Sequence, residues 1–172
     1  MVGLEHLWAG WRSAYLDAVV TDAASLRPDA RGSLFERILG SGLPDEEAYV
    51  VHRGPACSSI LNLYPYTNGH VLVVPNRAVA ELEAMTPGEH DAFWAEVRDA
   101  VVAVKAAYGC EGVNVGINLG AAAGAGIPDH LHAHVLPRWA GDTNFMTAVA
   151  ETRVMPEALG SSWRRLRDAW PA

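Results

Sequence analysis

The most regular pattern of the chain is a strict alternation of polar and apolar positions over residues 130–135. A period of two predicts a β-strand, in which residues two apart point to the same face, about 6.5–7 Å from each other. The polar positions are all histidine: His130, His132 and His134. The apolar positions between them face the other way: Leu131, Ala133 and Val135. A buried core does not favour three imidazoles on one face, because their ring nitrogens need partners.

Three earlier segments have the composition and the flanking turn residues that are typical of strands, namely 47–53, 58–64 and 70–74. The last two flank a cluster of turn residues from Tyr64 to Gly69, so we expect them to pair as an antiparallel hairpin. A further strand is predicted over residues 112–118, with the sequence GVNVGIN.

The clearest helix begins at Thr86. Pro87 suits the first helical position, and Glu89 stands three residues after the predicted cap. Apolar residues then recur at helical spacing as far as Tyr108, and Gly109 ends the pattern. This long helix lies between the predicted hairpin and the last two strands.

Shorter helices are expected near Phe35 and between Pro156 and Trp170. Together, these elements predict an α+β fold: an antiparallel sheet of about five strands with one long helix and short flanking helices. A chain of 172 residues fits one domain. We expect a single domain over 1–172, with an N-terminal arm over about 1–31 and a helical tail over about 146–172.

Composition narrows the possible functions. The formal net charge is −7, which argues against a broad basic surface for nucleic acid but allows a small nucleotide in a pocket. The apolar stretches are shorter than the roughly 18 residues of a membrane span, and no leader peptide is evident. Two cysteines are too few for a disulfide framework. We therefore expect a cytoplasmic protein that binds neither nucleic acid nor membranes.

The three histidines leave two chemical interpretations open. Neutral imidazole is a common zinc ligand, so His130 and His134 would be candidates for a metal centre. Alternatively, one histidine is a nucleophile, and its neighbours place protons and phosphate oxygens. The pattern His-φ-His-φ-His-φ-φ, completed by Val135 and Leu136, resembles the signature of the histidine triad (HIT) superfamily of nucleotide hydrolases and transferases.

The resemblance extends to the predicted hairpin, where Asn62, Pro65, Gly69 and His70 match the family's spacing. It implies that Asn62 contacts the ribose of a nucleotide. It also implies that His70 belongs to the hydrogen-bond network behind the triad.

A second matching segment precedes the histidines. In the family, an asparagine at a strand end and a glycine-rich loop hold phosphate oxygens, which implies nucleotide binding by Asn118 and by Gly124, Ala125 and Gly126. Glycines allow backbone N–H groups to approach an anion closely. Many relatives carry glutamine at or near the position of Gly126, where it acts on the leaving group.

The resemblance implies a mechanism in which His132 attacks an α-phosphorus and forms a nucleotidyl-histidine. A backbone carbonyl near His130 would hold its Nδ1–H, while His134, His130 and the loop stabilise the phosphate charge. The catalytic set is then His132, His130, His134 and His70.

Residues 64–69 and 138–145 look like a bacterial subgroup that includes diadenosine tetraphosphate phosphorylases. The implied ligand is an adenine nucleotide or a dinucleoside polyphosphate. A nucleoside phosphoramidate hydrolase, or a nucleotide-binding protein with little turnover, is the alternative.

Besides the missing glutamine at Gly126, the chain departs from the family at the positions of a zinc site. Many relatives have a Cys-x-x-Cys pair and a histidine that bind zinc, where this chain has Ser33, Glu36 and Ala78. We therefore expect no structural metal. The implied mechanism requires no cofactor, although Mg²⁺ can accompany a polyphosphate substrate. A homodimer is implied by resemblance.

Overall fold

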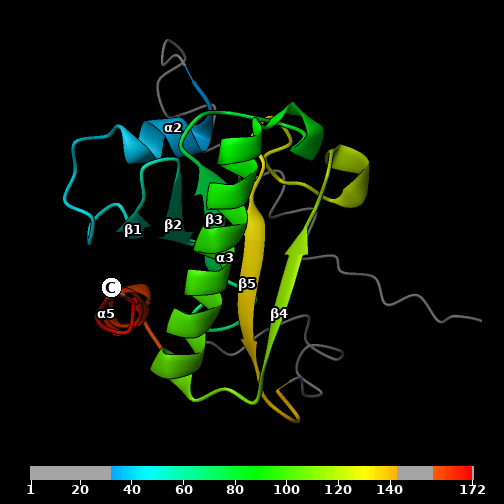
Figure 1. Ribbon diagram of the computed structural model, residues 1–172. Coiled ribbons are helices and arrows are strands. Elements are labelled where there is room, and N and C mark those ends of the chain that lie inside the picture. Colours follow the sequence, from blue (N-terminus) through cyan, green and yellow to red (C-terminus); the bar gives the residue numbers. More distant parts are fainter. Residues whose placement is uncertain (1–31, 143–156, 172) are drawn as a thin grey trace, which may run out of the picture.

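The structure is a computed structural model that describes residues 32–142 and 157–171. Its five strands form one antiparallel sheet with the order β1-β2-β3-β5-β4, which confirms the predicted α+β class (Figure 1). The strands are β1 (Val50–Arg53), β2 (Cys57–Leu61), β3 (Val71–Pro75), β4 (Gly112–Ile117) and β5 (Ala133–Arg138). The helices are α2 (Leu34–Leu39), α3 (Pro87–Tyr108) and α5 (Leu159–Asp168), with short 3-10 turns η1 (Leu82–Ala84) and η2 (Ala121–Ala123).

The two predicted arms are described only in part. Residues 1–31, and the portion of the predicted tail before residue 157, lie outside the described residues. The remainder of the tail contains α5, within the helix expected from Pro156 to Trp170. The single-domain organisation of the whole chain stays a prediction.

Helix α3 begins and ends where its sequence predicts. The Thr86 side chain accepts a hydrogen bond from the Glu89 N–H, and the Glu89 carboxylate accepts one from the Thr86 N–H. Gly109 takes the left-handed conformation that ends the helix. The helix crosses one face of the sheet (Figure 1). Its buried side chains pack there against alternate residues of the strands, including Val71, Val73, Ala133 and Val135.

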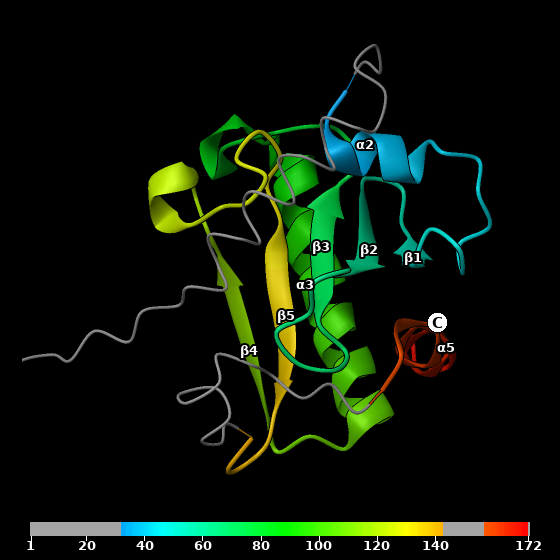
Figure 2. The same ribbon diagram turned by 180° about the vertical axis from the view of Figure 1, so that it is seen from behind.

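The opposite face of the sheet carries a second apolar cluster, because neighbouring residues of a strand point to opposite sides. Leu72 and Val74 of β3 pack there with Val50 and Ile60, and Phe35 of α2 covers them. Figure 2 views this face, with α2 at the end of the sheet where the histidine segment begins. The short helix α2 is therefore the element that brings an aromatic ring to the histidine side.

Two predicted strands are shorter in the structure. The segment 47–53 becomes a strand only at Val50, because residues 45–49 form a turn in which the Val50 N–H donates to the Asp45 carbonyl at 2.8 Å. Tyr49 in that turn has a φ of 54°, which excludes it from a strand. The segment 58–64 ends as a strand at Leu61. The predicted antiparallel pairing of β2 with β3 is confirmed.

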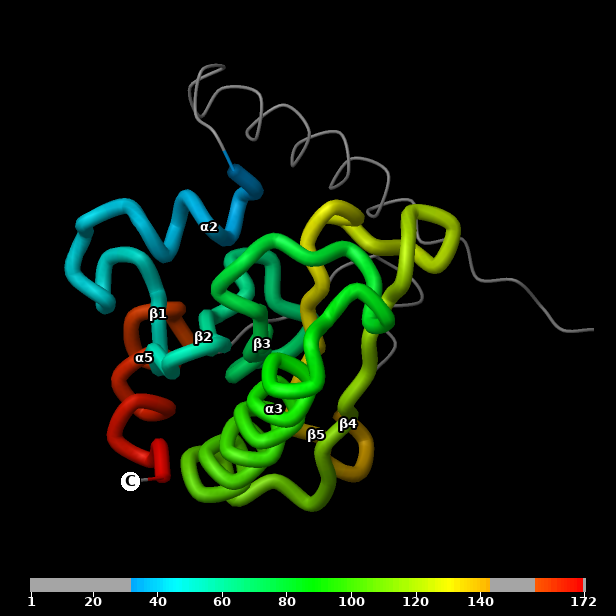
Figure 3. The backbone as a smooth tube through the Cα atoms, turned by 45° about the horizontal axis from the view of Figure 1, so that its top comes forward, coloured from blue at the N-terminus to red at the C-terminus, as the bar shows by residue number. Residues whose placement is uncertain are grey.

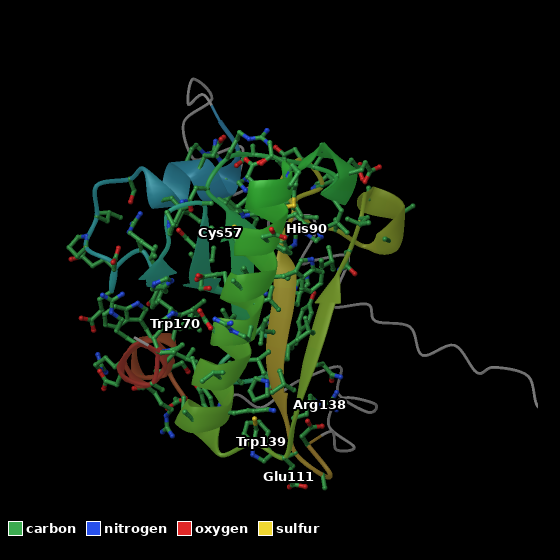
Figure 4. All side chains as sticks on the ribbon, viewed as in Figure 1. Cys57, His90, Glu111, Arg138, Trp139 and Trp170 are labelled. Carbon is green, nitrogen blue, oxygen red and sulfur yellow. The ribbon has the colours of Figure 1, made fainter. Side chains whose placement is uncertain are left out.

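The edge of the sheet at β1 is covered by α5, as Figure 3 shows. The Trp163 indole N–H donates to the Val50 carbonyl at 2.8 Å, and Arg167 donates to the Val51 carbonyl at 2.7 Å. Trp170, labelled in Figure 4, stacks on the His52 ring with 5.1 Å between ring centroids. These contacts satisfy edge carbonyls that would otherwise be available to another strand.

The other edge, at β4, pairs with β5 alone within the described sheet. The middle of β4 is exposed at Asn114, Val115 and Gly116. No helix in the described part of the chain has the length and apolar character needed to cross a membrane.

Candidate active site

The histidine segment shows the alternation that its sequence predicts. His134 lies opposite Leu72 of β3 and Gly116 of β4, so its ring is on the same face as Leu72. Leu131, Ala133 and Val135 pack into the core beneath α3. The imidazoles of His132 and His134 are neighbours, with their ring centroids 5.1 Å apart.

The first two histidines precede β5, which corrects the expectation that all three lie on one strand. The ladder with β3 ends at Ala133, and the Leu131 N–H donates instead to the Val79 carbonyl at 2.6 Å. The rings nevertheless share one side, because the Phe35 ring contacts both His130 and His132, with centroids 5.2 and 5.4 Å away.

The His132 ring is held in one tautomer. Its Nδ1–H donates to the backbone carbonyl of His130 at 2.8 Å, and a carbonyl can only accept. Nε2 of the neutral ring therefore carries a lone pair. Burial lowers the pKa of His132 below its ordinary value of 6.5, against a smaller opposing effect of the His130 carbonyl. The ring is thus neutral at neutral pH, and its Nε2 lone pair is of the kind that a nucleophilic histidine needs.

The His130 ring is bonded to the protein at both nitrogens. Its Nε2–H donates to the Pro75 carbonyl at 2.8 Å, and its Nδ1 accepts from the Ser33 hydroxyl at 2.5 Å. Both ring nitrogens therefore have a partner within the protein, and the His130 carbonyl accepts the hydrogen bond from His132 Nδ1–H. Stabilisation of phosphate charge by His130 stays a prediction.

The third ring, His134, is held from behind by His70, which is fully buried. The Tyr66 backbone N–H donates to His70 Nδ1 at 3.1 Å, so the His70 proton is on Nε2. That proton is donated to His134 Nδ1 at 2.9 Å. A neutral His134 consequently carries its own proton on Nε2, where it can donate to an oxygen.

The pKa shifts predict how stability depends on pH. Burial lowers the pKa values of His130 and His132 below 6.5. We expect the free energy of unfolding to fall as the pH drops below 6.5, because the unfolded chain then binds protons that the folded chain does not. The loss should level off once the pH lies under both folded-state pKa values.

Urea titrations from neutrality to about pH 5 measure this dependence. A His132→Asn variant retains only one of the two groups and should show a shallower profile. A parent protein whose stability stays constant over this range would contradict the prediction.

Asn62 is buried at the end of β2, where the sequence predicts a ribose contact. Its amide nitrogen lies 3.3 Å from His70 Nδ1, and its Oδ1 accepts from the Tyr64 N–H at 3.0 Å. The structure thus brings Asn62 into the network behind His134. Ribose binding by Asn62 stays a prediction.

The predicted phosphate loop connects β4 to the histidine segment. Asn118 follows the end of β4 directly, and η2 comes next. The loop folds back on itself, because the Ala125 N–H donates to the Gly120 carbonyl at 3.3 Å. Figure 2 shows η2 and α2 at the same end of the sheet. Nucleotide binding by Asn118, Gly124, Ala125 and Gly126 stays a prediction.

The positions that match a zinc site in relatives do not fit a metal here. Both carboxylate oxygens of Glu36 accept hydrogen bonds, from the backbone N–H groups of Ser33 and Ala78, each at 2.9 Å. These two bonds lower the pKa of Glu36. The Ala78 side chain has no ligand atom, and the Ser33 hydroxyl is bonded to His130. No group of three acidic, cysteine or histidine side chains among the described residues is arranged to hold a metal ion.

Two residues of the site were not assigned a role from the sequence. Tyr66 was part of the family motif, but its backbone N–H fixes the tautomer of His70, and its ring stacks near His134. The sequence identifies Ser33 only as a position where relatives have a zinc ligand. The Ser-x-x-Glu pattern that begins α2 predicts a helix cap, but nothing local in the sequence links it to a histidine 97 positions away.

An antiparallel five-stranded sheet, one long helix across one face and three neighbouring imidazoles on the other side define a histidine triad protein. The chain belongs to the HIT domain family, whose model matches residues 44–141.

Comparisons with known proteins agree. The chain is 39% identical to an AP-4-A phosphorylase of Mycobacterium tuberculosis over 97% of this chain and 85% of that protein. It is 36% identical to an asymmetrical bis(5'-nucleosyl)-tetraphosphatase of Schizosaccharomyces pombe over 54% of this chain and 50% of that protein. A solved zinc-bound histidine triad family protein of Mycobacterium smegmatis is 30% identical, with a TM-score of 0.62, over 80% of this chain and 92% of that chain.

Proposed function

We propose that the protein cleaves a dinucleoside polyphosphate, with diadenosine tetraphosphate as the leading candidate, at its α-phosphate through a nucleotidyl-histidine on His132. The observation that carries this proposal is the hydrogen bond from His132 Nδ1–H to the His130 carbonyl, which leaves a lone pair on Nε2 of a neutral ring. The names of the M. tuberculosis and S. pombe relatives support the substrate class.

In the first step, the Nε2 lone pair of His132 forms a bond to the α-phosphorus. The bond from that phosphorus to the bridging oxygen breaks, and its electron pair leaves with the remaining polyphosphate, which is ATP for this substrate. The Nε2–H of His134 donates a hydrogen bond to the phosphate oxygens as charge develops on them. His70 and Tyr66 support this role because they keep the His134 proton on Nε2.

In the second step, an acceptor oxygen attacks the same phosphorus from the opposite side. The phosphorus–nitrogen bond breaks, and its electron pair returns to Nε2 of His132, while a proton carried by the acceptor oxygen is released to solvent. Inorganic phosphate as the acceptor gives ADP, whereas water gives AMP. No cofactor takes part in either step, and Mg²⁺ accompanies the polyphosphate as part of the substrate.

Product analysis tests the proposal. We expect purified protein incubated with diadenosine tetraphosphate and inorganic phosphate to yield ADP and ATP, because the M. tuberculosis relative, which matches 97% of this chain, is called an AP-4-A phosphorylase. Chromatographic separation of the nucleotides, with and without phosphate, distinguishes the acceptors. AMP and ATP formed independently of phosphate would identify a hydrolase instead. Tight AMP binding without any product would contradict an enzymatic function.

We also infer that the protein is a cytoplasmic homodimer. The β1 edge of the sheet is covered by α5, whereas the β4 edge within the described sheet has no second strand. Val115, at the middle of β4, is 43% exposed, and an exposed apolar edge strand favours pairing with another copy. Sedimentation equilibrium of the purified chain measures the mass.

A further inference from the structure

The end of α2 nearest the histidines contains a polar cluster that the proposed reaction does not use directly. The Ser33 hydroxyl accepts a hydrogen bond from the Glu36 N–H at 3.2 Å and donates its own proton to His130 Nδ1 at 2.5 Å. Ser33 is 6% exposed and His130 is fully buried, so water does not replace this contact. One hydroxyl therefore caps a helix and binds the first histidine of the triad.

The direction of each proton in this cluster follows from its partners. The Glu36 N–H occupies one lone pair of the Ser33 oxygen, and the remaining O–H is directed at His130 Nδ1. The Pro75 carbonyl requires the His130 proton to be on Nε2. Both ends of the ring are thus bound in the same tautomer, with Nδ1 as an acceptor.

The cluster is also tied to the rest of the fold. Glu36 accepts from the Ser33 N–H and from the Ala78 N–H, which joins α2 to the segment after β3. Pro75, at the end of β3, binds the other side of the His130 ring. A change at Ser33 is therefore transmitted to His130, whose carbonyl is the acceptor for His132 Nδ1–H.

We propose that Ser33 is a positioning residue for the reaction: by binding His130 Nδ1 it fixes the His130 carbonyl, and this carbonyl orients the nucleophile His132. The inference rests on the proposed function for its kinetic readout. Its structural part, the tautomer of His130, holds for the protein without substrate. Loss of the Ser33 hydroxyl leaves the buried Nδ1 without its donor and allows the ring and its carbonyl to move.

The chain offers a matched control for Ser33→Ala. Thr86 at the start of α3 forms the same reciprocal cap with Glu89 at the same spacing, and its side chain accepts from the Glu89 N–H at 3.2 Å, the same length as the bond from the Glu36 N–H to Ser33. Thr86 is exposed and lies outside the proposed catalytic machinery. Thr86→Ala therefore removes a cap and an exposed hydrogen bond to Glu89, whereas Ser33→Ala removes a cap and the contact with a triad histidine.

Kinetics of both variants, with diadenosine tetraphosphate as substrate, test the proposal. We expect kcat to fall about 10- to 100-fold in Ser33→Ala with little change in KM, because misplacing a reacting group costs rate more than binding. Thr86→Ala should keep kcat within about twofold of the parent, because a lost cap affects chiefly stability. Equal kcat values in the two variants, measured where both are folded, would overturn the proposal.

Nitrogen-15 NMR of the histidine rings supplies a readout without turnover. The parent protein at neutral pH should show His130 with an unprotonated Nδ1 and a protonated Nε2, and Ser33→Ala should lose this single tautomer. A parent His130 protonated at Nδ1 would refute the inference even if Ser33→Ala fails to fold. A parent with the expected tautomer but no turnover refutes the proposed function and leaves the positioning of His130 standing.

Discussion

Replacing His132 with alanine is expected to lower kcat by at least about 10⁴-fold, because no other described group replaces the attacking nitrogen. The covalent nucleotidyl adduct should disappear with turnover. Rapid-quench experiments on diadenosine tetraphosphate measure both, when the denatured protein is examined for nucleotide bound to histidine. His90→Ala is a suitable control, since His90 is exposed on α3 and lies across the sheet from the triad.

A structural effect of the same substitution can be separated from a chemical one. The His132 side chain is buried and contacts Phe35, so alanine leaves a cavity that lowers stability. Urea unfolding shows whether the variant is folded under the assay conditions. A folded His132→Ala protein that cleaves at the parental rate would eliminate the nucleotidyl-histidine mechanism.

The local parts of the fold could be predicted from the sequence. The alternation over residues 130–135 predicted correctly that the core residues Leu131, Ala133 and Val135 lie opposite the imidazoles. The boundaries of α3 followed from Thr86 and Gly109. In each case a few neighbouring residues determine the backbone, because side-chain alternation and helix caps depend on local geometry.

The contacts between segments that are distant in the sequence could not be predicted from it. Ser33 and His130 are 97 positions apart, and a cap sequence does not specify which ring its hydroxyl also binds. The shortening of β1 depends on the turn at Tyr49, whose positive φ was not indicated by its β-favouring side chain. Tertiary packing decided both features.

The same limit applies to the roles of the three triad rings. Their spacing predicted equivalent positions, yet their hydrogen-bond partners make them different. His130 is bound at both nitrogens, His132 has its lone pair on Nε2, and His134 Nδ1 accepts a hydrogen bond from His70. A repeated residue in a regular pattern therefore does not imply a repeated function, because each tautomer is set by an acceptor or donor elsewhere in the fold.

Substitution of Gly69, in the turn before His70, is expected to destabilise the protein strongly. Gly69 has a φ of 71°, and a Cβ there would lie 2.3 Å from a ring carbon of Tyr108. The ring cannot move away without breaking the hydrogen bond from the Tyr108 hydroxyl to Glu157 (3.0 Å). We expect Gly69→Ala to lower the free energy of unfolding by about 3 kcal/mol or more, from the backbone conformation and the steric overlap together.

Gly109→Ala separates the two contributions. Gly109 also has a positive φ, 54°, but an added Cβ meets nothing within 4 Å, so its substitution should cost only about 1 kcal/mol. Urea denaturation of both variants measures the difference, and kcat should fall further in Gly69→Ala because the adjacent His70 holds His134. Equal destabilisation by the two substitutions would show that the contact with Tyr108 does not constrain the turn. A larger loss of stability and of kcat in Gly69→Ala would show that the packing of the β2–β3 hairpin on α3 holds His70, which donates a hydrogen bond to His134, in place.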